Sequence, residues 1–111
     1  MKKFMILYSA PISAEQQMQA AGSEGRNEGM ALWMKWFEKH GANIVEGGSP
    51  LVGGMSYTRG GNAKLQTPFL TGYTVVQAED MDGVAAMLQE HPHYFLPGAS
   101  IQAYEMMPMG M

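Results

Sequence analysis

The segment from residue 71 to residue 109 reads TGYTVVQAEDMDGVAAMLQEHPHYFLPGASIQAYEMMPM and decides the fold. Residues 71–78 are rich in β-branched and aromatic side chains, which favours a strand. Asp80 is a good N-cap for a helix over residues 81–91, because its carboxylate can accept hydrogen bonds from free backbone N–H groups. Residues 101–106 return as a strand, so the segment predicts a strand–helix–strand unit.

The N-terminal part of the chain predicts a strand and two helices. The strand covers residues 3–9, and Ser13 is expected to cap a short helix that ends by residue 20. A glycine-rich loop is expected over residues 22–29, and Asn27 within it is expected to cap the main helix. Four apolar residues of that helix recur at i, i+3, i+4 and i+7 and are expected to face the core: Met30, Trp33, Met34 and Phe37.

The middle of the chain predicts a second extended stretch over residues 43–52 and then a hairpin. Residues 56–58 and 63–66 flank a turn at Arg59-Gly60-Gly61-Asn62. The complete order predicts a ferredoxin-like α+β βαββαβ sandwich with an added hairpin, a mostly antiparallel sheet and both helices on one face. No repeat or low-complexity linker interrupts this order, so one domain is expected over residues 1–111.

The two predicted strands at residues 3–9 and 71–78 are apolar on both faces. A sheet that is covered on one side only should instead alternate apolar and polar residues. The face without helices is therefore expected to meet a second apolar surface, and a second copy of the same sheet is the simplest partner. A hydrophobic fraction of 46% in so short a chain also favours a homodimer through the sheet face.

The composition argues against several classes of protein. The net charge is −3 and the seven basic residues are scattered, so nucleic acid is not expected as a partner. The chain has no cysteine, which makes a cytoplasmic location the simplest expectation. No apolar segment approaches the ~20 residues of a membrane span, so no membrane partner is expected. Gly47-Gly48-Ser49-Pro50 lacks the lysine of a phosphate-binding loop.

His91 is the one polar residue on the predicted core-facing stripe of the second helix. A helix C-terminus stabilises an imidazolium, so we expect the pKa of His91 near neutrality, where a histidine can move protons. The same position also suits a histidine that caps the last helix carbonyls or forms a hydrogen bond within the core. His91 is thus the candidate catalytic residue, with a structural role as the alternative.

Three further residues are expected to shape a small-molecule pocket between sheet and helices: Tyr8, Trp36 and His93. Trp36 lies beside the predicted core stripe, so its indole is less committed to the core than that of Trp33. His91 and His93 form a His-Pro-His sequence, but a stable zinc or copper site needs a third or fourth ligand. Neither a metal nor another cofactor is therefore expected.

Several motifs resemble the YCII-related superfamily, in particular its DGPF branch. They are the run Met5-Ile6-Leu7-Tyr8, Thr71-Gly72-Tyr73 leading a strand, Glu79-Asp80 opening a helix, His91-Pro92 closing it, and the last strand Gly98-Ala99-Ser100-Ile101-Gln102-Ala103-Tyr104-Glu105. Thr67-Pro68-Phe69 stands where the branch carries Asp-Gly-Pro-Phe. The resemblance covers most of the chain and implies a ferredoxin-like fold assembled as a dimeric α+β barrel.

The resemblance also implies small-molecule chemistry by a His and an Asp in some members of the family. The His belongs after an Arg near the start of the first long helix, but here Arg26 is followed by Asn27, Glu28 and Gly29. The Asp belongs before the proline that ends the second helix, where this chain has His91. An enzyme of this kind would be a cofactor-free isomerase, lyase or dehalogenase-like protein. The alternatives are a non-enzymatic ligand-binding or accessory domain and an interaction protein whose sheet face binds a different partner.

Overall fold

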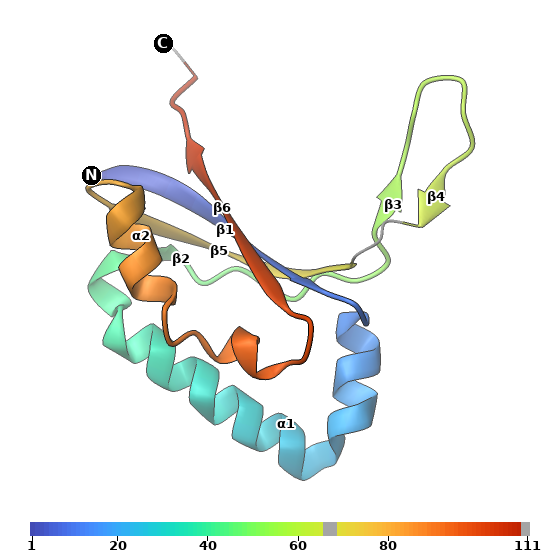
Figure 1. Ribbon diagram of the computed structural model, residues 1–111, viewed down its shortest axis with the longest axis horizontal. Coiled ribbons are helices and arrows are strands. Elements are labelled where there is room, and N and C mark those ends of the chain that lie inside the picture. The colour runs from blue at the N-terminus through green and yellow to red at the C-terminus, as the bar shows by residue number, and fades with distance from the viewer. Residues whose placement is uncertain (66–68, 110–111) are drawn as a thin grey trace.

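The computed structural model describes residues 1–65 and 69–109, which form an α+β sandwich (Figure 1). Four antiparallel strands make the main sheet in the order β2-β5-β1-β6. They are β2 (Ile44–Glu46), β5 (Phe69–Ala78), β1 (Lys2–Ala10) and β6 (Ser100–Met106). Each β-α-β unit leaves room for one strand of the other unit, as in a ferredoxin-like sheet. The predicted ferredoxin-like α+β fold is thereby confirmed, whereas the dimeric α+β barrel stays a prediction. Thr67 and Pro68 of the DGPF-like motif lie outside the described residues.

Helices α1 (Ala14–Lys39) and α2 (Met81–Leu88) cover the same face of this sheet (Figure 1). Side chains that alternate along β1 and β5 form the core with both helices: Phe4, Ile6, Tyr8, Trp36, Val76, Ala78, Val84 and Met87. Asp80 caps α2 as predicted, since its carboxylate accepts a hydrogen bond from the N–H of Gly83 at 2.9 Å. Among the helices of the described ranges, none combines the length and the hydropathy that a membrane crossing requires.

Helix α1 is longer than the sequence predicts. The expected loop over residues 22–29 is wrong, because the chain there continues as helix, and only Gly22 departs from helical geometry with φ 69° and ψ −178°. This one residue kinks the helix. Ser13 caps the helix start as predicted, in a reciprocal pair of hydrogen bonds with Gln16. Asn27, the expected second cap, lies inside the helix. The glycines on either side of it weaken the helix but do not end it, because packing against the rest of the fold supports it.

The buried face of α1 is rotated relative to the predicted stripe. Met30 and Met34 are 63% and 50% exposed, so their assignment to the core is wrong. The face that meets the rest of the fold keeps the i, i+3, i+4, i+7 spacing but starts three residues later, at Trp33, Trp36, Phe37 and His40. Both stripes satisfy the helical period, and only the position of the helix on the sheet distinguishes them.

Helix α2 ends at Leu88, so the expected position of His91 on its stripe is wrong. His91 has extended backbone, with φ −65° and ψ 133°, and directly precedes the 3₁₀ helix η2 (Pro92–Phe95). The ring of a proline collides with a helical residue before it and drives that residue to extended geometry. Pro92 therefore places His91 between two elements, where its ring turns inward to the core.

The connection between β2 and β5 contains the predicted hairpin. A 3₁₀ helix, η1 (Gly41–Asn43), first joins α1 to β2, which is shorter than the predicted stretch over residues 43–52. The chain then runs beside β5, where the N–H of Tyr73 donates to the carbonyl of Ser49 at 3.3 Å. Next β3 (Met55–Ser56) pairs with β4 (Lys64–Leu65) in a hairpin that projects from the sheet (Figure 1). Gln66, at the predicted end of this hairpin, lies outside the described residues.

Gly48 provides a test of how closely this connection packs on β5. Its φ is 80°, and a Cβ at this position would overlap the carbonyl oxygen of Tyr73. Gly48→Ala is expected to lower the free energy of unfolding by roughly 2–4 kcal/mol, because both backbone strain and the overlap oppose it. Gly47→Ala is the matched control, since no atom lies within 4 Å of its added Cβ. Urea unfolding measures both variants, and equal midpoints would contradict this packing.

Candidate functional site

A cavity of about 500 Å³ lies between α1, the end of β1 and the connection that follows β2. Its volume is in the range of small-molecule sites. The walls are mostly apolar and carry three aromatic rings of the helix and sheet: Tyr8, Trp33 and Phe37. His93 from η2 and Arg26 from α1 supply an imidazole and a guanidinium. The cavity therefore offers flat apolar walls and a few polar groups.

Small residues of α1 leave the space for this cavity. Ala21, Gly25 and Gly29 recur every four residues and line it. An added Cβ at Gly29 would meet no atom within 4 Å, and Gly29 does not have positive φ, so neither sterics nor backbone geometry requires glycine there. Glycine inside a helix costs about 1 kcal/mol relative to alanine. Glycine at position 29 therefore lowers the stability of α1 but leaves open volume in the cavity.

The four residues that the sequence predicts for the site lie close together in the structure. Nε2 of His91 lies 3.0 Å from the hydroxyl of Tyr8, and the ring centroids of His91 and Trp36 are 4.4 Å apart. The rings of Tyr8 and His93 lie 5.2 Å apart. Tyr8 and His93 line the cavity, whereas His91 and Trp36 lie behind it. The catalytic and binding roles of the four residues stay predictions.

Hydrogen bonds allow the proton on the ring of His91 to be inferred. Nδ1 accepts a bond from the backbone N–H of His93 at 3.0 Å, so the hydrogen of the neutral ring belongs on Nε2. Nε2–H then donates to the hydroxyl of Tyr8, which in turn donates to Oγ1 of Thr74 at 2.8 Å. The Thr74 hydroxyl donates to the carbonyl of Gly47 at 3.2 Å. A directed chain of hydrogen bonds thus runs from η2 to the connection that borders the cavity.

The members of this chain are held in their neutral forms. Burial, as the largest cause, and the charges of the nearby His93 and His40 together lower the pKa of His91 from 6.5 to about 3. A protonated ring would also lose the hydrogen bond that Nδ1 accepts. The expected pKa near neutrality is therefore wrong for this buried position. Burial raises the pKa of Tyr8 to about 12, although its hydrogen bond to Thr74 acts in the opposite direction.

His93 is the imidazole that borders the cavity. Its Nε2 lies 2.9 Å from the carbonyl of Ser9, to which it donates a hydrogen bond. Burial lowers the pKa of His93. The backbone carbonyls of Ser9 and Ser100 partly oppose this shift, because they stabilise the protonated ring. Of the two histidines, His93 is thus better placed to carry a proton at the cavity.

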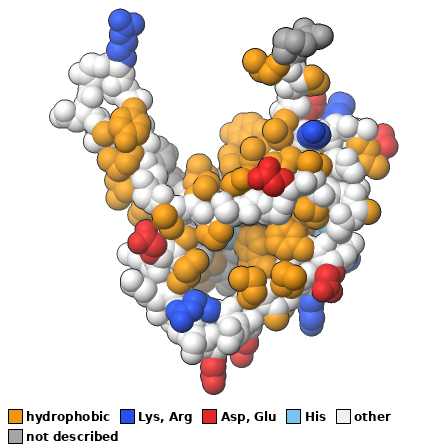
Figure 2. Space-filling view, turned by 180° about the vertical axis from the view of Figure 1, so that it is seen from behind, with side chains coloured by type: hydrophobic (Ala, Val, Ile, Leu, Met, Phe, Trp, Pro, Cys, Tyr) orange, Lys and Arg blue, Asp and Glu red, His pale blue; other side chains and the backbone are white. Residues whose placement is uncertain are grey.

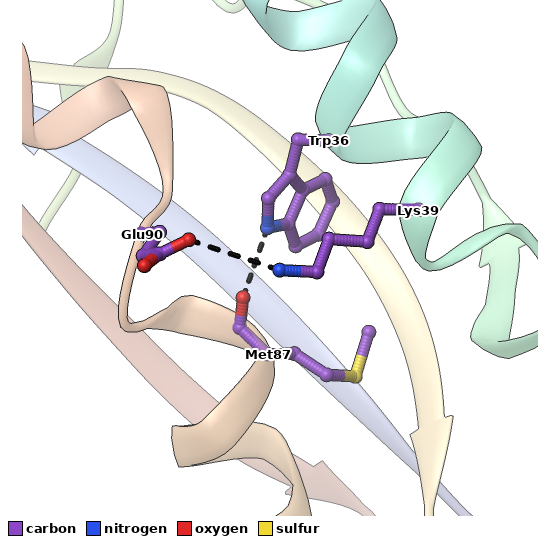
Figure 3. Close-up of polar contacts among 4 residues, drawn as sticks. All are labelled: Trp36, Lys39, Met87 and Glu90. Carbon is purple, nitrogen blue, oxygen red and sulfur yellow. Dashed lines mark hydrogen bonds and ion pairs between the residues drawn. The ribbon is translucent and has the colours of Figure 1, made fainter.

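Trp36 joins the two helices. Its indole N–H donates to the carbonyl of Met87 at 2.9 Å, and the nearby Lys39 and Glu90 form an ion pair at 3.7 Å (Figure 3). These groups border a separate groove of about 310 Å³ between α1 and α2. Trp33, which the sequence assigns to the core, is the tryptophan that lines the larger cavity.

The two histidines share no third metal ligand in the part of the chain that the structure describes. Nδ1 of His91 is occupied by the N–H of His93, and Nε2 of His93 by the carbonyl of Ser9. Across the described ranges, no group of three or more His, Asp or Glu side chains is arranged to hold a metal ion. The absence of a metal from the working protein stays a prediction.

The low pKa of His91 predicts a loss of stability in acid. The unfolded chain takes up a proton on this residue near pH 6.5, whereas the folded chain does so only near pH 3, so protonation favours unfolding between these values. The contribution of neutral His91 to the free energy of unfolding is fully present above pH 6.5. Below this pH, the free energy of unfolding should fall by up to about 1.4 kcal/mol per pH unit. Urea unfolding at a series of pH values measures this slope. His91→Asn should flatten it and His40→Asn should keep most of it, and an unchanged slope in His91→Asn would refute the assignment.

No family model and no curated protein matches this chain. Among solved structures, the fold is similar to that of 5-chloro-2-hydroxyhydroquinone dehydrochlorinase from Burkholderia phenoliruptrix, in a complex with 2,5-dihydroxybenzoquinone. The similarity has a TM-score of 0.51 at 17% sequence identity and covers 90% of each chain. At this identity the similarity shows a related fold and nothing about activity, so the YCII-related resemblance stays a prediction.

Proposed function

We propose that this protein binds a small planar ring compound in the cavity between α1 and the sheet and catalyses a cofactor-free proton transfer or elimination on it. The observation that carries the proposal is a cavity of about 500 Å³ with aromatic walls and one bordering imidazole. Tyr8 and Trp33 already pack edge to face, with ring centroids 4.9 Å apart. A flat ligand that enters beside them gains further offset or edge contacts with their rings.

The structural similarity supports the choice of a first ligand. The dehydrochlorinase holds 2,5-dihydroxybenzoquinone, which is a planar six-membered ring with oxygen substituents. A compound of this size fits a cavity of about 500 Å³. The likeness in fold does not carry the activity across, but it makes this quinone a reasoned probe for the site.

His93 is proposed as the group that exchanges the proton. In an elimination, its neutral ring would take a proton from the substrate, the electron pair of that broken bond would form the new double bond, and chloride would leave with the electron pair of the broken C–Cl bond. The role that the sequence suggests for His91 would require a relay through the hydroxyl of Tyr8, because the ring of His91 does not line the cavity. On this proposal His91 orients Tyr8, and Tyr8 shapes the wall.

The alternative is a ligand-binding domain without catalysis. The hydrogen bonds of His91 and Tyr8 are satisfied within the protein, and their shifted pKa values keep both groups neutral around pH 7. These properties suit a rigid binding site as well as a catalytic one. The expected lack of a cofactor and the cytoplasmic location stay predictions in either case.

We also propose that two copies associate through the sheet face that carries no helices, as in a dimeric α+β barrel. Apolar side chains of three strands occupy this face: Met5, Leu7, Tyr73, Val75, Tyr104 and Met106. Tyr104 is 61% exposed and Met106 is 40% exposed. Figure 2 shows hydrophobic side chains gathered between the projecting hairpin and the C-terminal end of the chain. A second copy of the sheet would remove the exposed members of this group from water.

Filling the cavity tests the binding site. Gly29→Leu is expected to weaken binding of 2,5-dihydroxybenzoquinone by about tenfold or more, because the new side chain occupies the open volume next to the helix. The stability should not fall, since leucine is the better helix former by about 0.8 kcal/mol. Isothermal titration calorimetry measures the affinity. Ala31→Leu, on an exposed position of the same helix, should bind like the wild type. Equal affinity of all three proteins would place the ligand elsewhere.

Chloride release from a chlorinated hydroxyhydroquinone separates the enzyme from the binder. The enzyme proposal expects release by the wild type and a loss of roughly 100-fold or more in His93→Gln, with ligand affinity largely retained. A ligand that binds but is recovered unchanged from the wild type supports the non-enzymatic alternative. Full turnover by His93→Gln would refute the role of His93.

Sedimentation velocity tests the proposed dimer. The wild type is expected to sediment as a dimer at micromolar concentration, and Tyr104→Glu as a monomer, because a carboxylate buried in an apolar interface without a partner is costly. Leu32→Glu, at a position of α1 that is 40% exposed, is the control and should leave the dimer intact. A monomeric wild type would remove the proposal.

A further inference from the structure

We infer that Arg26 recognises a negatively charged oxygen of the ligand, so that the cavity selects small planar anions over neutral rings of the same size. This inference rests on the proposed function, because it concerns the same cavity. It names the class of ligand, which neither the aromatic walls nor the volume of the cavity determines. Carboxylates and ionised ring hydroxyls share the required chemistry.

Arg26 is the one permanently charged side chain among the described residues that line the cavity. The other polar side chains on its walls are neutral or, in the case of His93, have a lowered pKa: Gln17, Ser49, Thr71 and His93. No carboxylate lines the described part of the wall to neutralise the guanidinium or to repel an anion. Arg26 is itself exposed, so water screens part of its attraction to an anion, and direct hydrogen bonds must supply the rest.

The guanidinium of Arg26 has donors to spare. The ion pairs within the described ranges join Lys2 to Glu105 and Lys39 to Glu90, so neither involves Arg26. One nitrogen, Nη1, donates to the carbonyl of Met18 at 2.9 Å. The remaining N–H groups of the planar fork can meet two oxygens of a carboxylate, or a ring oxygen, with charge-assisted hydrogen bonds.

The bond to Met18 also fixes where the guanidinium lies. Met18 and Arg26 stand on opposite sides of the kink at Gly22, so the bond connects the two arms of α1. Both residues line the cavity. An arginine held in this way loses less side-chain freedom when it binds an anion, which favours affinity. The same bond gives Arg26 a structural role, and the experiment must separate the two roles.

Benzoate and benzyl alcohol form a matched pair of probes, since both carry one benzene ring and only benzoate is charged. NMR titration of the wild type should give an affinity for benzoate about tenfold or more above that for benzyl alcohol. Arg26→Gln should remove this preference by weakening benzoate and leaving benzyl alcohol unchanged. Arg26→Lys should keep part of the preference, because it retains the charge without the fork.

Controls distinguish this inference from the proposal on which it rests. Lys35→Gln removes a cation of α1 that does not line this cavity and should change neither affinity. If Arg26→Gln weakens the binding of both probes equally, Arg26 acts only by bracing the helix, and the inference is overturned. A different result is that Arg26→Gln keeps the preference for benzoate over benzyl alcohol while Gly29→Leu weakens the binding of both probes. That result would overturn the inference and leave the cavity proposal standing. A wild type that binds neither probe would overturn both.

Discussion

The hydrogen bond between His91 and Tyr8 is the constraint on which the site depends. It joins residues 83 positions apart in the chain and continues through Thr74 to the carbonyl of Gly47. Strand β1, strand β5, the segment after α2 and the connection after β2 are thereby fixed to one another. In the described part of the chain, no buried side-chain nitrogen or oxygen lacks a hydrogen-bond partner. A polar network that is fully satisfied in this way specifies one arrangement of the elements around it.

Much of the fold follows from local sequence signals. The apolar strand-forming run of β1 and the cap at Asp80 each have a local physical cause and predict elements that the structure contains. The continuity of α1 does not follow, since glycines at positions 22, 25 and 29 resemble a loop. Packing against the sheet compensates for their poor helix propensity, and this packing energy depends on the three-dimensional arrangement and not on local sequence.

The candidate site could be predicted as a group of residues but not as a geometry. Tyr8, Trp36, His91 and His93 do come together, yet which of them reaches the cavity depends on small rotations. The buried stripe of α1 starts three residues after the predicted one, and at about 100° per residue this rotates it by about 60° around the helix axis. The extended backbone before Pro92 places the ring of His91 in the core, and His93 is the histidine that lines the cavity. Arg26 had no signal of its own in the sequence, because a lone cation on a helix is usually solvated.

The two sides of the cavity differ in how far they can yield. The side made by the connection after β2 touches β5 so closely that Gly48 has no room for a methyl group against Tyr73. The opposite side is a helix with a bend at Gly22, where nothing lies within 4 Å of an added Cβ. The helical side is therefore the one that can yield when a ligand binds, while the sheet side stays in place. Ligands that differ in thickness would be accommodated by the angle of one helix, and ligands that differ in outline would be discriminated by the rigid sheet side.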